Sequence, residues 1–232
     1  MKTEAHVIRT KNFATDAADF ILEKARKAVA ERNEFRIALS GGNTPRSVYT
    51  RLVTVAHDFP WQLTHITFGD ERCVPPDDKD SNFRMARETL LAPAAVPEES
   101  VTRMRGEIDP QIAAQEYQAH LDLMANQRGE QIYRHDLILL GLGDDGHTAS
   151  LFPGTAALDE QIRRAIANFV PKFNAWRLTF TFPLINAARH ILFLVGTSKN
   201  PALIERVLQG ESQFPAARVN PTAGEVTWMI GE

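Results

Sequence analysis

Apolar side chains recur along residues 13–31 with the three-and-four spacing of an amphipathic helix. The period then changes, because residues 35–39 form a short apolar run that ends in the glycine-rich turn 40–45. A helical pattern resumes from Val48 to Val55. This part of the chain therefore predicts a helix, a strand, a glycine turn and a second helix.

Further apolar runs end in glycine or polar turns in the same way, and a helix is predicted after the last of them, over residues 201–208. Strands of this kind that alternate with helices indicate an α/β fold, a mainly parallel sheet with helices on both faces. Residues 177–182 alternate more strictly and predict an additional, half-exposed strand. The other runs and their turns are 63–68 with 69–72, 136–140 with 141–147, and 191–195 with 196–199.

The chain has 232 residues, of which 44% are hydrophobic, enough to bury a large core. It shows no internal repeat and no long linker, so we expect one domain over residues 1–232. Open parallel sheets bind ligands beyond the carboxyl ends of their strands. The turns that follow the predicted strands are therefore the places where chemistry is expected.

Charge and composition exclude several classes of function. The 26 basic and 29 acidic side chains leave a net charge of −3, so nucleic acid is not a predicted partner. The single cysteine, Cys73, excludes an intrachain disulfide and a multi-thiolate metal site. Residues 1–6 lack a signal-peptide pattern, and no stretch approaches the roughly 18 apolar residues of a membrane span. We expect a cytoplasmic globular protein without a membrane partner.

The first turn is compatible with a phosphate site. Gly42, Asn43 and Thr44 precede Pro45, which suits the first turn of a helix because its missing N–H has no partner there. Free amides at a helix start favour a phosphate group. An ordinary strand-to-helix connection with Thr44 as the N-cap is an equally good interpretation. The turn lacks the Gly-Lys-Ser/Thr ending of a nucleotide P-loop, so ATP hydrolysis has no support.

Residues 141–146 match the dinucleotide pattern G-x-G-x-x-G, but Asp144 and Asp145 would repel a pyrophosphate there. No second strand ending in an acidic residue follows at about 20 residues, as a ribose contact requires. Asp145 is instead close enough to His147 to orient its imidazole and support the protonated form. A hydrogen-bonded structural histidine is the competing interpretation. No metal is predicted, because no other His or Cys lies nearby at ligand spacing.

Further charged residues are predicted at strand ends. Asp70 is a candidate base or hydroxyl ligand, and Arg72 a candidate anion clamp, although a surface ion pair would give the same pattern. Residues 73–81 have the composition of a mobile flap. Arg177 and Lys199 add cations at or beside strand ends. Together with the glycine turn and the oriented histidine, they predict a small phosphorylated substrate and acid–base chemistry.

Five segments, in chain order, closely resemble the 6-phosphogluconolactonase family. The fourteen-residue motif around His147 is highly specific, whereas the first motif is shared with glucosamine-6-phosphate deaminases and isomerases and has Asn43 where the family usually has Ser. The segments are residues 40–45, Gly69-Asp70-Glu71-Arg72 with Ser81-Asn82, residues 141–154, Arg177-Leu178-Thr179 and Val226-Thr227-Trp228.

The resemblance implies a Rossmann-like sheet of the deaminase/isomerase type and cofactor-free hydrolysis of 6-phospho-D-glucono-1,5-lactone to 6-phospho-D-gluconate in the oxidative pentose phosphate pathway. In our hypothesis His147, oriented by Asp145, takes a proton from water and returns one to the leaving ring oxygen. Arg72 or a backbone amide would stabilise the oxyanion, or Arg72 would bind the phosphate. The phosphate is expected at the opposite end, held by the amides of Gly42, Asn43 and Thr44 and by Arg177 and Lys199.

Two alternatives accompany this hypothesis. Deaminases and isomerases on the same scaffold carry a Glu five residues beyond the motif histidine, where this chain has Phe152, which cannot move a proton. A non-catalytic sugar-phosphate sensor is the other alternative, but the chain has no additional basic helix-turn-helix segment. It also keeps both Asp145 and His147, which a sensor would not need.

Overall fold

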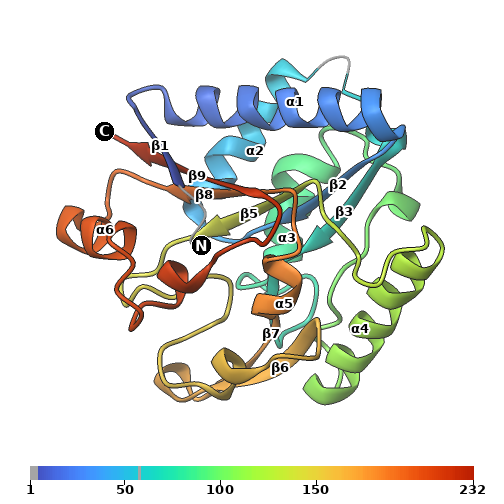
Figure 1. Cartoon of the computed structure of the whole chain (residues 1–232). Coiled ribbons are helices and arrows are strands. Elements are labelled where there is room, and N and C mark those ends of the chain that lie inside the picture. Colours follow the sequence, from blue (N-terminus) through green and yellow to red (C-terminus); the bar gives the residue numbers. More distant parts are fainter. Residues whose placement is uncertain (1–4, 57–58) are drawn as a thin grey trace.

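The computed structural model describes residues 5–56 and 59–232. The prediction that residues 1–6 contain no signal-peptide pattern therefore falls mostly outside the described residues. Its centre is a six-stranded sheet, parallel at every pairing, in the order β1-β9-β8-β5-β2-β3 (Figure 1). This confirms the mainly parallel α/β fold. The strands are β1 (Ala5–Thr10), β2 (Phe35–Leu39), β3 (Thr64–Phe68), β5 (Leu137–Gly141), β8 (His190–Val195) and β9 (Glu225–Gly231).

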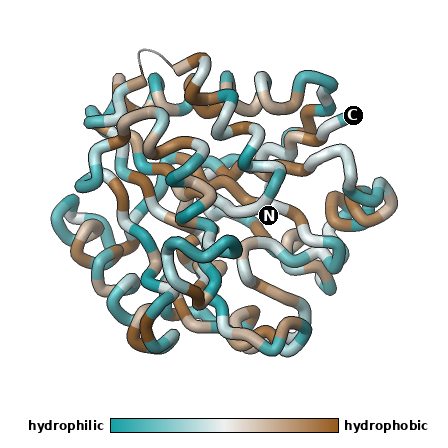
Figure 2. The backbone as a smooth tube through the Cα atoms, turned by 180° about the vertical axis from the view of Figure 1, so that it is seen from behind, coloured by the Kyte–Doolittle hydropathy of each residue, from teal (hydrophilic) through white to brown (hydrophobic). Residues whose placement is uncertain are grey.

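Helices cover both faces of this sheet and bury a separate apolar cluster against each. Apolar stretches consequently run through the middle of the molecule, while many outer turns are hydrophilic (Figure 2). On one side lie α1 (Phe13–Arg32), α2 (Asn43–Val55) and α3 (Asn82–Ala86), and on the other α4 (Pro110–Asn126), α5 (Phe182–Ile185) and α6 (Pro201–Leu208).

A second, antiparallel sheet of three strands lies beside the carboxyl ends of the main sheet, in the order β4-β7-β6. It comprises β4 (Asp70–Arg72), β6 (Ala165–Val170) and β7 (Ala175–Phe180). The expectation of a polar turn at 69–72 was therefore wrong, because the backbone of these residues pairs with β7. The additional strand predicted over 177–182 is present, but it ends at Phe180 and α5 begins at Phe182.

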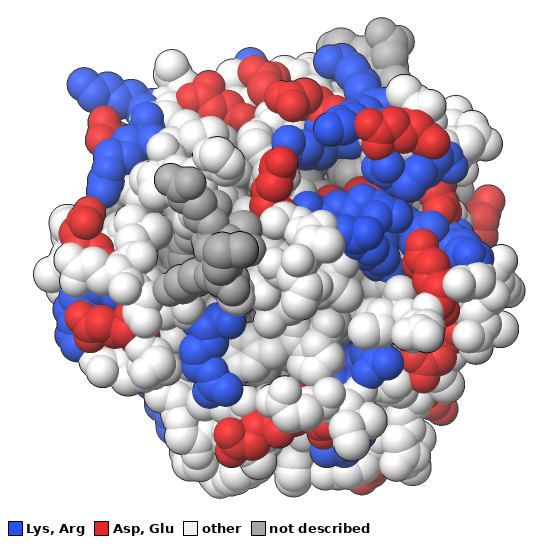
Figure 3. Space-filling model, in the orientation of Figure 1, with Lys and Arg blue, Asp and Glu red and all other residues white. Residues whose placement is uncertain are grey.

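Among the described residues, no helix has the length and apolar character needed to cross a membrane. On the face shown in Figure 3, acidic and basic side chains are interspersed, and many of them gather on the right-hand side. A group of acidic and basic side chains surrounds Glu34, just before β2. Its carboxylate accepts hydrogen bonds from Arg36 and from Arg128, 2.7 Å away at the Arg128 Nη2 atom. Burial would raise the pKa of Glu34, but these two arginines outweigh it and lower the pKa to about 2.

The Glu34 carboxylate should make stability depend on pH. Because its pKa is lower in the folded state, its contribution is complete above the ordinary carboxyl value and is lost as the pH falls towards about 2. Glu34→Gln should lower the free energy of unfolding by about 1–3 kcal/mol at pH 7 and by less at pH 3. Urea denaturation at both pH values measures this, with Glu23→Gln on the surface of α1 as the control. An equal loss at both pH values would contradict the assignment.

Candidate active site

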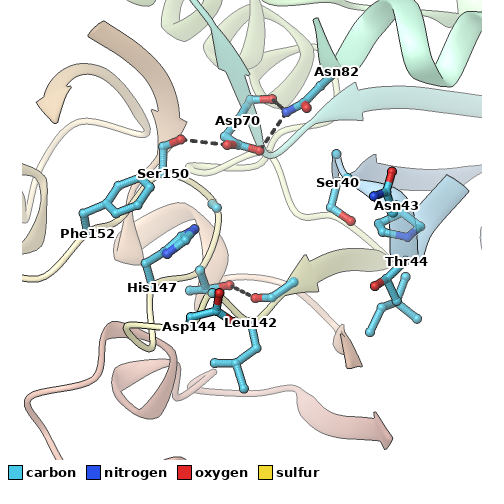
Figure 4. A pocket seen from close by; sticks show the side chains of 18 of the residues that line it. Ser40, Asn43, Thr44, Asp70, Asn82, Leu142, Asp144, His147, Ser150 and Phe152 are labelled. Atoms are coloured by element: carbon cyan, nitrogen blue, oxygen red, sulfur yellow. Dashed lines mark hydrogen bonds between the residues drawn. The ribbon is translucent and has the colours of Figure 1, made fainter. Parts of the chain in front are cut away.

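A cavity of about 590 Å³ lies beyond the carboxyl ends of β2, β5 and β8. The strand order reverses here, because the chain continues from β2 to one edge of the sheet and from β5 towards the other. Such a switch point is the expected ligand site of an open α/β sheet. Four basic and two acidic side chains line the cavity, which therefore favours an anionic ligand. Figure 4 shows His147 on one wall, with Asn43 and Thr44 across from it.

His147 is held in one orientation from two directions. Its Nδ1 atom lies 2.5 Å from Asp145 Oδ1, so this nitrogen is engaged by the carboxylate. Its ring stacks on Phe152 with a centroid separation of 3.9 Å and an interplanar angle of 25°. With Nδ1 engaged, Nε2 is the atom that can exchange a proton with a ligand. The predicted pair of Asp145 and His147 is thus present, with His147 lining the cavity and Asp145 behind it.

Asp145 carries a firmly held negative charge. Its other oxygen, Oδ2, accepts a hydrogen bond from Lys172 Nζ at 2.9 Å. Burial would raise the pKa of Asp145, but the hydrogen bonds from His147 and Lys172 outweigh it and lower the pKa to about 2. The carboxylate therefore stays ionised at neutral pH and fixes the tautomer of the imidazole.

The glycine turn forms the opposite wall. Gly42 is the N-cap of α2, with φ at +104°, a conformation that favours glycine. The alternative interpretation, in which Thr44 is the N-cap, is wrong, because α2 already begins at Asn43 and Thr44 lies within its first turn. Beneath the turn, the buried Tyr49 hydroxyl accepts a hydrogen bond from Ser40 N and donates one to Ser40 O. The amides of residues 42–44 are thereby presented at a helix start, the geometry that anion binding uses.

Arg72 and Arg177 lie side by side as cross-strand partners in the register of β4 with β7. Like charges directly opposite each other destabilise a sheet, so an arrangement of this kind suits a ligand with more than one negative charge. Burial and the charge of Arg72 both lower the pKa of Arg177. Arg72 also donates to the backbone carbonyl of Asp80, which ties it to the loop 73–81. The prediction that this loop is a mobile flap remains untested.

Lys199 lies at the cavity with its Nζ atom 2.7 Å from Asp144 Oδ1. This ion pair lowers the pKa of Asp144, which is almost fully exposed. Water competes with Lys199 for the exposed Asp144 carboxylate, so the net stability of the pair is small. A bound phosphate could therefore take Lys199 from Asp144 at small cost.

Asp70 is buried at the edge of the cavity, and both of its carboxylate oxygens have partners. Oδ2 accepts from Ser150 Oγ at 2.7 Å, and Oδ1 accepts from Asn82 Nδ2 at 3.1 Å (Figure 4). Asn82 Nδ2 also donates to the Asp70 carbonyl. Ser150 and Asn82 both donate hydrogen bonds to the Asp70 carboxylate. This carboxylate is therefore better suited to binding a substrate hydroxyl than to abstracting a proton.

Sequence reasoning gave no role to Lys172, Phe173 or Ser150, although all three line the cavity. Ser150 and Phe152 lie within the motif of residues 141–154, so the length of this motif indicated that they belong to the site. Lys172 is separated from Asp145 by 27 residues, and no local pattern indicates that contact. Within residues 5–56 and 59–232, no three His, Cys, Asp or Glu side chains are grouped as a metal site would need.

Comparisons with known proteins show the family to which the chain belongs. Residues 9–228 match the family described as glucosamine-6-phosphate isomerases/6-phosphogluconolactonase. The chain belongs to this family. It is 43% identical to a 6-phosphogluconolactonase of Synechocystis sp. over 91% of this chain and 88% of that protein, and 38% identical to one of Nostoc sp. over the same shares.

Solved structures in the glucosamine-6-phosphate isomerase/6-phosphogluconolactonase family share the fold. A 6-phosphogluconolactonase from Trypanosoma cruzi superposes with a TM-score of 0.85 at 29% identity, covering 100% of this chain and 96% of that one. The Thermotoga maritima enzyme of the same name gives a TM-score of 0.86 at 25% identity, covering 98% and 100%. The Rossmann-like fold of the deaminase/isomerase type, implied by the resemblance, is confirmed.

Proposed function

We propose that this chain, as one domain over residues 1–232, hydrolyses 6-phospho-D-glucono-1,5-lactone to 6-phospho-D-gluconate in the oxidative pentose phosphate pathway without a cofactor. The observation that carries the proposal is the His147–Asp145 pair, which opens onto a cationic cavity opposite a helix start. The names and coverage of the family relatives support the same activity. A cytoplasmic location, and the lack of nucleic-acid and membrane partners, remain predictions from the sequence.

The hydrolysis follows from the two nitrogens of His147. Nδ1 is engaged by Asp145, so Nε2 accepts a proton from a water molecule as the water oxygen attacks the lactone carbonyl carbon. The tetrahedral intermediate then collapses, the bond from that carbon to the ring oxygen breaks, and the imidazolium donates its proton to the leaving oxygen. The carboxylic acid product ionises in water. Asp145 stabilises the imidazolium during the step in which it is charged.

The phosphate occupies the far end of the cavity in this proposal. A phosphate ester carries a charge of about −1.5 to −2 at neutral pH, which matches two adjacent guanidinium groups better than a single oxyanion does. We therefore assign Arg72, as well as Arg177 and Lys199, to the phosphate, together with the amides of Gly42, Asn43 and Thr44. Asp70 binds a sugar hydroxyl rather than acting as a base. Binding the remote phosphate fixes the carbonyl beside His147.

Phe152 separates this proposal from the deaminase and isomerase alternative. Its ring lies flat against the imidazole, in the place where a proton-carrying glutamate would be needed. An apolar ring at that place can orient His147 but cannot transfer a proton. The sensor alternative is less well supported too, because Asp145 and Lys172 fix the imidazole in a way that binding alone does not require.

The decisive experiment generates the lactone in situ from glucose 6-phosphate and follows its disappearance with and without the protein. The spontaneous hydrolysis, which grows with pH, is subtracted from both traces. We expect clear acceleration of lactone loss and no release of ammonia from glucosamine 6-phosphate in a parallel assay. Equal rates with and without protein would refute the proposal, and ammonia release would support the deaminase.

Lys199→Ala should chiefly raise KM. The variant loses one charge-assisted hydrogen bond to the phosphate, which corresponds to about a 10- to 100-fold increase, while the chemistry at His147 is unaffected. Steady-state kinetics on the freshly generated lactone measure both constants. A fall in kcat at unchanged KM would contradict an anchoring role for this lysine.

A further inference from the structure

The hairpin of β6 and β7 reaches the catalytic histidine through its tip. The tip is a short 3₁₀ turn, Pro171–Phe173, followed by Asn174 in a left-handed conformation. Two consecutive side chains of the turn, Lys172 and Phe173, line the cavity. Neither takes part in a chemical step of the mechanism described above, yet each contacts a partner of His147.

The two contacts approach His147 from different sides. Lys172 Nζ donates to Asp145 Oδ2 at 2.9 Å, while His147 Nδ1 lies 2.5 Å from Oδ1 of the same carboxylate. The ring of Phe173 meets Phe152 edge-on, with centroids 5.6 Å apart and an interplanar angle of 81°. Phe152 in turn stacks on the imidazole. The hairpin tip therefore supports both the edge and the face of the His147 ring.

We propose that Lys172 is a positioning residue for His147, which acts through Asp145 to hold the imidazole in the orientation that proton transfer needs. This inference rests on the proposed lactone hydrolysis. A carboxylate held at one oxygen can rotate about its bond to the side chain, whereas one held at both oxygens has a fixed plane. Oδ1 of Asp145 is held by Nδ1 and by the backbone N of His147, and Lys172 supplies the contact at Oδ2.

The charge of Lys172 strengthens this contact. Its ammonium group and the Asp145 carboxylate form an ion pair as well as a hydrogen bond. A neutral side chain of the same length would make neither interaction. Removal of the charge should therefore lower kcat, which depends on the orientation of His147, and leave KM unchanged.

Other charged groups face the same region but come from other elements, so a variant at position 172 leaves them in place. Asp144, on the same loop as His147, is paired with Lys199. The remaining charged side chains that line the cavity are Asp70, Arg72 and Arg177, from β4 and β7.

Lys172 can be replaced without a large cost to folding. Its side chain is 56% exposed, and an exposed ion pair contributes little to stability. Lys172→Met keeps the length of the side chain and removes the charge. Lys172→Arg keeps the charge and can still reach Asp145. Lys27→Met, on the exposed side of α1, removes the same charge far from the cavity and serves as the matched control.

The experiment measures kcat and KM for the wild type and the three variants. We expect Lys172→Met to lower kcat by about 10-fold at unchanged KM, because Asp145 loses its contact at Oδ2. Lys172→Arg and Lys27→Met should keep the wild-type kinetics. Thermal denaturation of each variant shows that the fold is retained.

Two results would overturn the inference. A rise in KM at unchanged kcat in Lys172→Met would mean that Lys172 binds the substrate directly, and wild-type kinetics in this variant would mean that the ion pair has no effect on His147. Either result in an active wild type leaves the proposed function standing. A wild type that does not accelerate lactone hydrolysis would refute the proposed function and this inference together.

Discussion

His147→Ala should lower kcat/KM for the lactone by about 10²–10⁴, because the variant has no group that can take a proton from water and return it to the ring oxygen. The residues that we assign to the phosphate do not include His147, so binding of 6-phosphogluconate should survive. Kinetics on the lactone and calorimetric titration with the product measure the two effects separately. His147→Ala therefore separates the catalytic step from binding of the phosphate end.

A surface histidine provides the control for this variant. His120 is exposed on α4, where its ring bonds to Thr102, and His120→Ala should keep the wild-type rate. Wild-type activity in His147→Ala would remove this histidine from the mechanism. Loss of product binding along with activity would mean that His147 serves the ligand as a whole rather than the reacting carbonyl.

Gly143→Ala should reduce the activity nearly as much as His147→Ala does, although it removes no catalytic group. A methyl group on this residue would lie 2.0 Å from two atoms of the His147 ring, far inside contact distance. The backbone hydrogen bond from Gly143 N to His147 O, at 2.9 Å, holds the two residues together. The His147 ring must therefore turn away from the added methyl group. A displacement of about 1 Å at a catalytic group can cost about 10²-fold in rate. We expect a loss of that order in kcat.

Gly69→Ala is the matched control, since its added methyl group would meet only one atom, the Leu39 carbonyl oxygen, at 3.7 Å. This variant should keep nearly normal kinetics. A crystal structure of Gly143→Ala should show the imidazole rotated away from Asp145. A normal kcat in Gly143→Ala would mean that the loop yields without moving the ring and that the orientation of His147 is not critical.

Local sequence signals predicted much of the fold. The strand at 35–39 and the helix at 201–208 have the bounds that their apolar patterns indicate. The edge strand β1 was missed, because most of its side chains are exposed and it has no apolar run. Helix α4 was also missed, although Asp109 caps it and Pro110 opens it, two signals that were present in the sequence.

Long-range contacts explain what could not be predicted in the site. Asp145 and His147 are two residues apart, so their pairing follows from local geometry. Arg72 and Arg177 face each other because of the register between two antiparallel strands, β4 and β7. These two residues are more than 100 positions apart in the sequence. Periodicity carries no information about register between distant strands. The functional roles that we give to these residues remain predictions.

The order of strands also has a consequence for how the protein is made. β1, the first strand, lies at the edge of the main sheet, and its neighbour there is β9, the last strand. The ribosome synthesises β1 more than 200 residues before it synthesises β9. Until translation reaches the final strand, the β1 segment has no strand to pair with, and the side chains of Val7 and Ile8 are exposed.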